Sequence, residues 1–310
     1  MWSFIKRLQN QGVMSINRRN ADYVLRYNPR KLYPIVDDKL ATKTLAINAG
    51  IAVPTLHAVI ETEHQIKENR DLLEGLGDFV IKPAHGAGGD GILVIDAKIQ
   101  EYYRKASGAL LSLEDINYHL SLILSGAYSL GGHPDVALIE HRVQSDPIFA
   151  EISHHGVPDV RVITLLGYPA MAMVRLPSRL SDGKANLHQG AIGVGIDLAT
   201  GKTLGGVWHN GTIDFHPDTL NPIAGIQVPH WDKILHLAAS CYELTGLGYL
   251  GVDIVLDKDQ GPLMLELNAR PGLNIQIANR QGLLTRFKDI ETHAAQALTI
   301  DERITFSRRL

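Results

Sequence analysis

The chain has 310 residues, 45% of them hydrophobic, and a formal net charge of -3. This length predicts a sizeable core in one large domain or two lobes, and the near-neutral charge argues against nucleic acid as the main partner. The only cysteine, Cys241, excludes disulfides within one chain and is interpreted as a small buried residue of a helix. No segment has the pattern of a signal peptide or a membrane span, so we expect a soluble, cytoplasmic protein.

Helices and short strands alternate irregularly along the first half of the chain. Apolar residues at helical spacing mark the helices, and β-branched residues mark the strands. The predicted helices span residues 1–35, which are basic, and 37–49, 62–75 and 112–126. The predicted strands span residues 56–60, 79–82, 92–95 and 136–140. In the helix at 112–126, one face carries Leu113, Ile116, Leu120 and Ile123.

The second half of the chain is richer in strands. The predicted strands span residues 160–166, 169–176, 191–196, 249–256 and 262–267, with a further pair within 202–213. Helices are expected at 230–244 and 290–298, and the tail is expected to be frayed. Helices and hairpins mixed in this way favour α+β lobes over alternating βαβ units.

The segment FVIKPAHGAGGDGILVI, residues 79–95, contains a match to G-x-G-x-x-G at Gly86 to Gly91. A dinucleotide-binding turn needs a helix after the glycines, because the helix N-terminus holds the pyrophosphate. Here the glycines precede ILVID, which is predicted to be a strand. A Walker A loop is also excluded, since no Lys-Ser or Lys-Thr follows the last glycine. The segment therefore predicts a hairpin with a glycine-rich tip.

Two interpretations of this hairpin remain open. Glycine permits positive φ angles, which can aim backbone N–H groups at one anion, and Lys82 at the end of the first strand could reach a phosphate there. A mobile surface hairpin with a solvated lysine explains the same residues. The hairpin alone does not decide between them.

A second hairpin is predicted in GYLGVDIVLDKDQGPLMLELNARPG, residues 248–272. Alternation along its second strand places Glu266 and Asn268 on one face. If Leu256 pairs with Leu263, Asp253 on the first strand lies opposite Glu266. Facing carboxylates repel unless a cation lies between them, and Mg²⁺ is bound in this way by one or two carboxylates and substrate phosphates.

The alternative for these residues is a pair of unrelated surface acids. The strongly apolar residues around them favour the metal site over two solvated carboxylates. Arg270 continues the same face beyond Asn268, where it could meet a phosphate or carboxylate, or be an ordinary loop residue before Pro271.

The motifs DDKLATKTLAINAGIAVP, VIKPAHGAGGDGI and ELNARPGLNIQ together resemble the ATP-grasp superfamily over about residues 36–300. Within it the chain is most similar to RimK-related α-L-glutamate ligase-like proteins, including the sugar-transfer-associated ATP-grasp group. The resemblance implies an α+β ATP-grasp fold with a nucleotide held between two lobes. The implied segments are a helical extension at 1–35, an N-lobe at 36–140 with the glycine hairpin, a C-lobe at 141–300 with the magnesium hairpin, and a tail at 301–310.

The resemblance also implies roles for single residues. ATP would contact Lys39, Lys82, His85, Gly86, Gly88, Gly89, Gly91, Glu140, His141, Val143 and Asp146 or Gln144, with residues 139–143 as the hinge beside the adenine. Mg²⁺, as two ions and with Mn²⁺ as a substitute, would be held by Asp253, Glu266 and Asn268. The phosphates or the substrate would face Arg161, Arg175, Asn186, His188 and Arg270.

One departure from the family concerns the start of the chain. ATP-grasp ligases usually carry a full α/β domain before the first lysine, whereas fewer than 40 residues precede Lys39 here. The acceptor site is therefore expected to be open, built by the N-terminal helices, or completed by a partner protein. An open site favours a peptide or protein acceptor over a small metabolite.

The implied reaction is ATP-dependent ligation of a carboxylate to an amine through an acylphosphate, such as addition of glutamate to a peptide or protein. No side-chain nucleophile is needed, and His154, His155 and His209 are interpreted as exposed loop residues. The alternatives are an ATP-grasp kinase that stops after phosphoryl transfer, and a regulatory or scaffold protein that binds ATP without chemistry.

Overall fold

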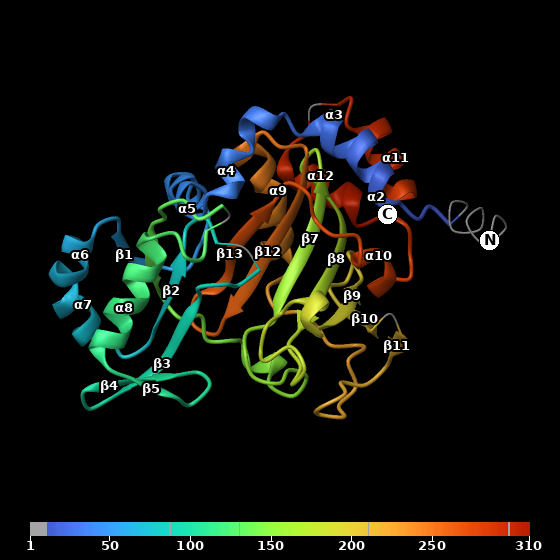
Figure 1. The fold of residues 1–310 in the computed structure, drawn as a ribbon. Coiled ribbons are helices and arrows are strands. Elements are labelled where there is room, and N and C mark those ends of the chain that lie inside the picture. The colour runs from blue at the N-terminus through green and yellow to red at the C-terminus, as the bar shows by residue number, and fades with distance from the viewer. Residues whose placement is uncertain (1–10, 87, 130, 210, 297) are drawn as a thin grey trace. The chain divides into compact units, whose positions relative to one another are not determined.

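The computed structural model describes residues 11–86, 88–129, 131–209, 211–296 and 298–310 (Figure 1). The chain divides into two compact units. Unit 1 contains the described part of residues 1–36 together with 45–52 and 144–310, and unit 2 contains 37–44 and 53–143. The first ten residues of the predicted N-terminal extension lie outside the described residues. No helix in the described part of the chain is long and apolar enough to cross a membrane.

Unit 2 is built on a six-stranded antiparallel sheet with the order β1-β6-β2-β3-β4-β5. Its strands are β1 (Leu56–Ile60), β2 (Phe79–Pro83), β3 (Leu93–Ile99), β4 (Tyr102–Lys105), β5 (Leu110–Leu111) and β6 (Ala137–Glu140). Its helices are α6 (Glu63–Glu68), α7 (Arg70–Gly75) and α8 (Leu113–Leu124), and the first part of α5 (Lys39–Asn48) also belongs to it. Ile116, Leu120 and Ile123 of α8 are buried in the core of this unit, which confirms the predicted apolar face.

The polar helix predicted at 62–75 is two short helices instead of one. Thr62 begins α6 with a capping box in which its side chain accepts from the backbone of Gln65. Asn69 then leaves helical geometry, with φ -91° and ψ 11°, and separates α6 from α7. The short strand β4 and the edge strand β5 were also not predicted.

Unit 1 is built on a seven-stranded antiparallel sheet with the order β11-β10-β9-β8-β7-β12-β13. Its strands are β7 (Asp159–Leu165), β8 (Tyr168–Leu176), β9 (Ile192–Ile196), β10 (Thr203–Trp208), β11 (Gly211–Ile213), β12 (Tyr249–Asp257) and β13 (Gly261–Asn268). Its longer helices are α9 (Trp231–Thr245), α11 (Leu283–His293) and α12 (Ile300–Ser307). Shorter helices are α2 (Ile16–Arg18), η1 (Arg19–Val24), α3 (Leu25–Tyr27), η2 (Arg30–Leu32), α4 (Pro34–Asp37), η3 (Pro147–Phe149), η4 (Leu187–Gln189) and α10 (Ile275–Ala278). Two antiparallel sheets with helices confirm the α+β prediction.

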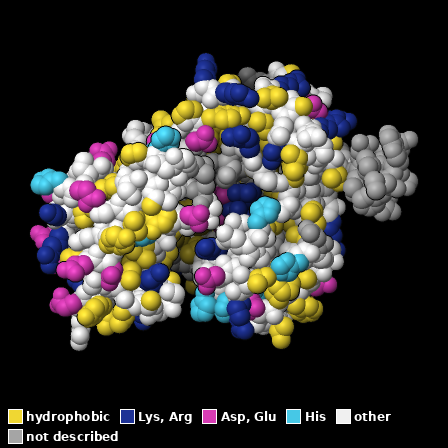
Figure 2. Space-filling model, in the orientation of Figure 1, with side chains coloured by type: hydrophobic (Ala, Val, Ile, Leu, Met, Phe, Trp, Pro, Cys, Tyr) yellow, Lys and Arg dark blue, Asp and Glu magenta, His cyan; other side chains and the backbone are white. Residues whose placement is uncertain are grey.

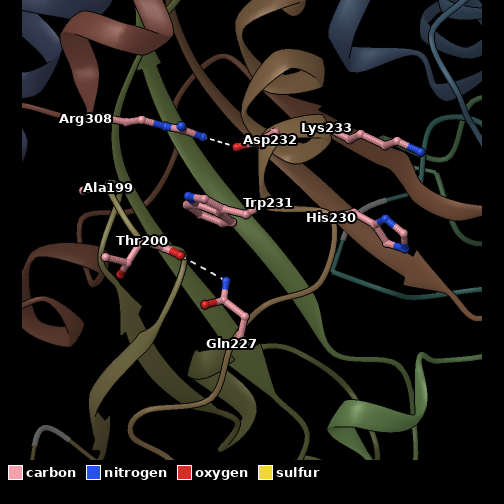
Figure 3. Close-up of a pocket in the computed structure, with 8 residues that line it drawn as sticks. All are labelled: Ala199, Thr200, Gln227, His230, Trp231, Asp232, Lys233 and Arg308. Atoms are coloured by element: carbon pink, nitrogen blue, oxygen red, sulfur yellow. Dashed lines mark hydrogen bonds and ion pairs between the residues drawn. The ribbon is translucent and has the colours of Figure 1, made fainter.

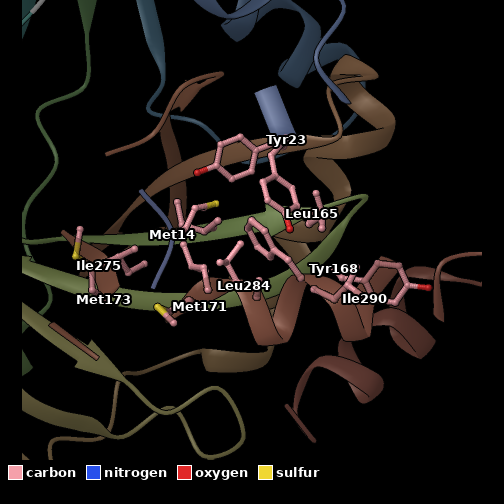
Figure 4. Packing of buried hydrophobic residues seen from close by; sticks show 14 of the residues in the cluster. Met14, Tyr23, Leu165, Tyr168, Met171, Met173, Ile275, Leu284 and Ile290 are labelled. Atoms are coloured by element: carbon pink, nitrogen blue, oxygen red, sulfur yellow. The ribbon is translucent and has the colours of Figure 1, made fainter. Parts of the chain in front are cut away.

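The core of unit 1 joins the N-terminal segment to one face of the sheet (Figure 4). Alternation directs Leu165 of β7 and Tyr249 of β12 to the same side, where they pack with Tyr23 and Phe287. The rings of Tyr23 and Phe287 lie 4.7 Å apart, and in Figure 1 the helices α2 and α3 run beside α11. The N-terminal segment is therefore an integral layer of unit 1.

Helix α9 packs on strands β7, β8, β12 and β13 of the same sheet. Its Cys241 is fully buried, as predicted, and burial raises the pKa of the thiol well above its ordinary value. The residue is therefore an apolar packing group at neutral pH.

The C-terminal tail is folded, so the prediction of a frayed tail was wrong. Thr299 begins α12 with a capping box in which its hydroxyl accepts from the backbone of Glu302. Arg303 of this helix is buried, donates a 3.2 Å hydrogen bond to the Leu166 carbonyl and pairs with Glu243. The preceding helix, predicted at 290–298, begins earlier and spans Leu283–His293.

Candidate functional site

The glycine hairpin has the predicted strand–loop–strand form. Strands β2 and β3 are antiparallel, with Phe79 paired with Ile95 and Ile81 with Leu93. Gly88 and Gly89 at the tip have φ angles of 67° and 88°, and a Cβ at either position would meet no atom within 4 Å. These positive φ angles in open space are the backbone geometry that lets a loop approach an anion closely.

The base of this hairpin is braced on both sides. The Lys39 ammonium donates to the Gly86 carbonyl, and the His119 Nε2–H donates to the Gly91 carbonyl at 2.9 Å. A Cβ at Gly91, where φ is 76°, would lie 2.6 Å from the ring of Tyr128. The loop is therefore anchored at its two ends, and its tip stands in open space.

Glu140 joins two buried lysines of unit 2. Its Oε2 lies 2.8 Å from the Lys82 ammonium, and its Oε1 lies 3.0 Å from the Lys43 ammonium. Lys43 also donates a 2.5 Å hydrogen bond to the Pro54 carbonyl. Burial lowers the pKa of Lys43 to about 8, although the Glu140 carboxylate opposes this shift. Two ammonium groups and one carboxylate give this cluster a formal net charge of +1, so Lys82 is fixed in place within a cationic group.

Lys43 was missed by the sequence reasoning. It stands four residues after Lys39 on α5 and is 4% exposed, so the two lysines share one side of the helix. The lysine pair at this spacing in DKLATK was the signal that could have found it.

His85 is held by two acids of unit 2. Its Nδ1 lies 2.7 Å from the buried Asp135 carboxylate, which also accepts from the His85 backbone, and its Nε2 lies 3.6 Å from Asp38. This arrangement fixes the backbone just before Gly86. In the structure His85 therefore anchors the start of the glycine loop. Its partner Asp135 is a second residue that the sequence reasoning missed.

The predicted hinge residues lie at the end of β6 and in the segment after it. His141 donates from its backbone to the Thr55 carbonyl at 2.8 Å, and Val143 is buried. In unit 1, the Gln144 backbone donates to the Asp257 carboxylate at 3.0 Å. The Asp146 side chain accepts from the Ile148 backbone at 2.9 Å and caps η3.

The carboxylate hairpin has the predicted facing pair but not the predicted register. Asp253 of β12 is opposite Glu266 of β13, whereas Leu256 pairs with Pro262 and not with Leu263. A β-bulge between the pairs of Asp253 and Ile254 inserts Leu265, which is 38% exposed, and shifts the pairing by one residue. The predicted register was wrong by one residue at the turn, and the bulge restores the predicted pairing of Asp253 with Glu266.

Asp253 is buried among arginines. Arg161 on β7 donates to its two oxygens at 2.6 and 2.5 Å, and Arg175 on β8 donates to Oδ2 at 2.8 Å. Arg175 also pairs with both oxygens of Asp159. The strand registers cause this, because Asp253 is opposite Arg161 and Asp159 is opposite Arg175. Asp159 was missed, although its alternation with Arg161 in DVRV was visible.

The two acids of this network differ in their pKa values. Burial and the Asp253 charge raise the pKa of Asp159 to about 6, against the opposing effect of Arg175. Burial would also raise the pKa of Asp253, but Arg161 and Arg175 outweigh it and hold the pKa of that carboxyl below its usual range. Asp253 is therefore ionised at neutral pH.

Asp253, Glu266 and Asn268 carry carboxylate and amide oxygens, the ligand type that Mg²⁺ prefers, but both Asp253 oxygens already accept hydrogen bonds from arginines. The Asn268 amide nitrogen lies 3.3 Å from Asp253 Oδ2, which leaves the amide oxygen of Asn268 for another partner. Glu266 is half-buried next to both. Among the described residues, no group of three or more His, Cys, Asp or Glu side chains could hold a metal ion. The predicted set has only two carboxylates and one amide, so a bound ion would need phosphate oxygens as further ligands.

The remaining predicted residues lie on loops of unit 1. Asn186 caps η4, its side chain accepting from the His188 backbone at 3.0 Å, and the His188 side chain is exposed. The exposed Arg270 guanidinium lies 5.2 Å from the centre of the Tyr33 ring. Arg19 donates to the carbonyl of Pro271 at 2.9 Å. The segment after β13 is thus held by the N-terminal segment.

Figure 3 shows a surface pocket of unit 1, about 450 Å³ in volume, that none of these residues lines. Its lining is Ala199, Thr200, Gln227, His230, Trp231, Asp232, Lys233 and Arg308. Arg308 pairs with Asp232, and the Trp231 indole N–H donates to the Leu198 carbonyl at 2.9 Å. None of the predicted ATP, metal or substrate residues lines this pocket, so we assign it no role in the chemistry.

Comparison with known proteins gave a family match and a set of similar structures. A family model described as sugar-transfer associated ATP-grasp matches residues 18–292. A search of curated proteins found no match.

Among solved structures, the ATP-grasp ligase PsnB complexed with a minimal precursor is 16% identical, with a TM-score of 0.45 over 87% of this chain and 63% of that chain. The D-cycloserine synthetase DcsG is 15% identical, with a TM-score of 0.49 over 87% and 74%. The D-alanine–D-alanine ligase from Bacillus anthracis, complexed with ATP, is 13% identical, with a TM-score of 0.44 over 88% and 66%. The chain thus spans less than two thirds of the length of PsnB.

Proposed function

The chain belongs to the sugar-transfer associated ATP-grasp family and has the α+β ATP-grasp fold, and from this we propose that it is an ATP-dependent carboxylate–amine ligase. The observation that carries the proposal is the pairing of Asp253 with Glu266, next to Asn268 and two strand arginines. A set of two acids, one amide and arginines suits a metal-bound polyphosphate.

Unit 2 would supply the cations and amides for the ATP phosphates. Lys82 is fixed by Glu140, and Lys39 is fixed on the Gly86 carbonyl at the base of the glycine loop. Gly88 and Gly89 would let the loop backbone approach the phosphates, and the hinge backbone around His141 would meet the adenine. Positioning and charge neutralisation are the main demands of phosphoryl transfer, so these groups suit that step.

In unit 1, Asp253, Glu266 and the Asn268 amide oxygen would hold Mg²⁺. A bound Mg²⁺ supplies charge neutralisation on the β- and γ-phosphate oxygens. Arg161 and Arg175 keep Asp253 ionised and oriented for this role. Arg270, exposed and supported by Tyr33, would bind the substrate carboxylate, since a guanidinium fork matches a planar carboxylate.

The reaction proceeds in two displacements. A substrate carboxylate oxygen attacks the γ-phosphorus, the bond to the β-phosphate oxygen breaks, and an acylphosphate and ADP form. An amine then attacks the acyl carbon, phosphate leaves, and the amine loses a proton to give the amide. We further propose that the reaction adds an amino acid such as glutamate to a peptide or protein, with Asn186 and His188 beside the acceptor.

Release of ADP with Mg²⁺ tests the proposal. The protein is incubated with ATP and a panel of amino acids, amines and peptides, and products are identified by mass spectrometry. A ligase gives ADP and phosphate only when carboxylate and amine are both present, and a new amide mass appears. ADP release that is independent of any amine would support a kinase instead, and ATP binding without turnover across the panel would support a scaffold protein.

A further inference from the structure

The positive charge of this chain is concentrated at its N-terminus. Residues 1–36 contain seven Lys and Arg residues and one acid, a formal charge of +6. The remaining residues contain 23 basic and 32 acidic residues, a formal charge of -9. The overall charge of -3 therefore hides a strongly basic segment, and such asymmetry is typical of a segment that binds an anionic surface.

The described part of this segment has an inner and an outer face. Helical turns run without a break from Ile16 to Tyr27 through α2, η1 and α3. On the inner face Tyr23 and Val24 are 4% exposed and belong to the core of unit 1. On its exposed side the segment carries Ile16 and Leu25, which are 61% and 64% exposed. Two large aliphatic side chains are thus presented to solvent by a helix that is already firmly packed.

The same segment carries exposed basic side chains. Arg18 pairs with Asp22 at 3.1 Å and Arg26 with Glu291 at 3.0 Å, but both arginines are strongly exposed, so these pairs are weak. Arg30 and Lys31 follow in the exposed turn η2. In Figure 2 basic and hydrophobic side chains lie together over this part of the molecule.

We propose that this face, formed by Ile16, Arg18, Leu25, Arg26, Arg30 and Lys31, docks on an anionic lipid bilayer surface. Positive charge alone would suit a nucleic acid or an acidic protein as well. Exposed aliphatic side chains among the basic ones favour a lipid interface, where charge meets anionic head groups and the apolar groups enter the acyl boundary.

Two further features support a lipid surface. Outside the described residues, the sequence MWSFIKRLQN adds residues of the same two kinds, namely Trp2, Phe4, Ile5, Lys6, Arg7 and Leu8. The excess of acidic residues in the rest of the chain is repelled by the same surface, so the protein would bind through this one face. The ligase would then act on substrates held at the membrane.

Co-sedimentation of the full-length protein with vesicles tests the proposal. The vesicles contain phosphatidylcholine alone or with phosphatidylglycerol, at low and at high salt. We expect binding only to the vesicles with phosphatidylglycerol, and at least about tenfold weaker binding for Arg30→Glu/Lys31→Glu. Leu25→Ser is expected to weaken binding at high salt, where the charge contribution is screened. The control Lys67→Glu/Lys202→Glu reverses two exposed lysines elsewhere and is expected to bind like the wild type.

Several outcomes would overturn the proposal. They are absence of binding to the anionic vesicles, equal loss of binding in the test and control variants, and binding of RNA without binding of vesicles. Unchanged far-UV circular dichroism and melting temperature of each variant establish that it is folded. None of the substituted residues is assigned to the ATP or metal site, so a failed vesicle assay leaves the proposed ligase activity untouched.

Discussion

A single buried carboxylate, Glu140, pairs with two lysines, and the burial of one of them, Lys43, makes that lysine sensitive to pH. Its pKa is lowered from the ordinary 10.5 to about 8, chiefly by burial. The unfolded chain therefore binds more protons than the folded chain between these values. Folding with a charged Lys43 carries a cost below about pH 8, and that cost is relieved as the pH rises towards 10.5.

We therefore predict a pH-dependent difference in stability between the wild type and Lys43→Met. The free energy of unfolding of the wild type, relative to the variant, should rise between about pH 8 and 10.5, by at most about 3 kcal/mol. Urea unfolding at a series of pH values measures it, with Lys67→Met on the exposed side of α6 as control. A difference that does not change with pH would show that Lys43 is not a titrating buried group.

The two facing acids of the carboxylate hairpin are predicted to respond differently to substitution. Asp253→Asn removes the charge that compensates Arg161 and Arg175, so it should destabilise the fold by about 3–5 kcal/mol. Glu266→Gln, at a half-buried position, should change stability by less than about 1 kcal/mol but lower turnover at least about 100-fold. Chemical unfolding and ADP release measure the two effects. Wild-type turnover in Glu266→Gln would remove this residue from the proposed site.

The glycines of the hairpin fall into two kinds. A side chain at Gly91 would collide with Tyr128, whereas a side chain at Gly88 or Gly89 would meet no neighbouring atom. Gly91→Ala places a Cβ against the Tyr128 ring at a positive φ, so we expect a loss of stability of about 1–3 kcal/mol. Gly88→Ala adds a methyl group in open space and should cost about 1–2 kcal/mol. If the loop tip binds the ATP phosphates, the added methyl group of Gly88→Ala keeps the backbone away from them. We therefore expect weaker nucleotide binding even under conditions where the variant is fully folded.

Thermal unfolding and titration with a fluorescent ATP analogue distinguish these effects. The assignment of the loop tip to phosphate binding would be contradicted if Gly88→Ala bound nucleotide like the wild type.

The sequence predicted helices and strands correctly where a long run of residues carried the helical or strand pattern. Runs of β-branched and apolar residues identified β7, β8 and β12, alternation identified β13, and helical patterns identified α8 and α9. The capping box at Thr299 and Glu302 was present in the sequence, yet α12 was missed because the tail lacks a long apolar stripe. The bulge at Leu265 was not predictable, since no turn or glycine marks it.

The ion-pair network could not be predicted, because it depends on the register between strands far apart in sequence. From the family resemblance, Arg161 and Arg175 were expected to face the phosphates or the substrate, and in the structure they pair with Asp253 and Asp159. Which acid meets which arginine follows from the pairing of β7 with both β8 and β12. For the same reason Glu140 was recognised but its partner Lys43 was not.

Asn28 joins the N-terminal segment to the carboxylate hairpin of unit 1. It is buried, donates to the carbonyls of Tyr249 and Ala269 at 2.7 and 2.9 Å, and accepts from the Tyr249 backbone at 2.9 Å. Asn28→Ala would leave these buried groups without partners, so we predict a loss of about 3 kcal/mol in the free energy of unfolding. Asn17→Ala, on the exposed side of the same segment, is the control and should leave the free energy of unfolding unchanged within about 0.5 kcal/mol.

The division of the chain also bears on how this protein can be dissected. The chain passes from one compact unit to the other after residues 36, 44, 52 and 143. A protease cut at any one of these points leaves the two bodies covalently tethered, and neither can be expressed as an uninterrupted fragment. Exchange of one lobe with a relative would therefore require several splice junctions, one of them inside helix α5.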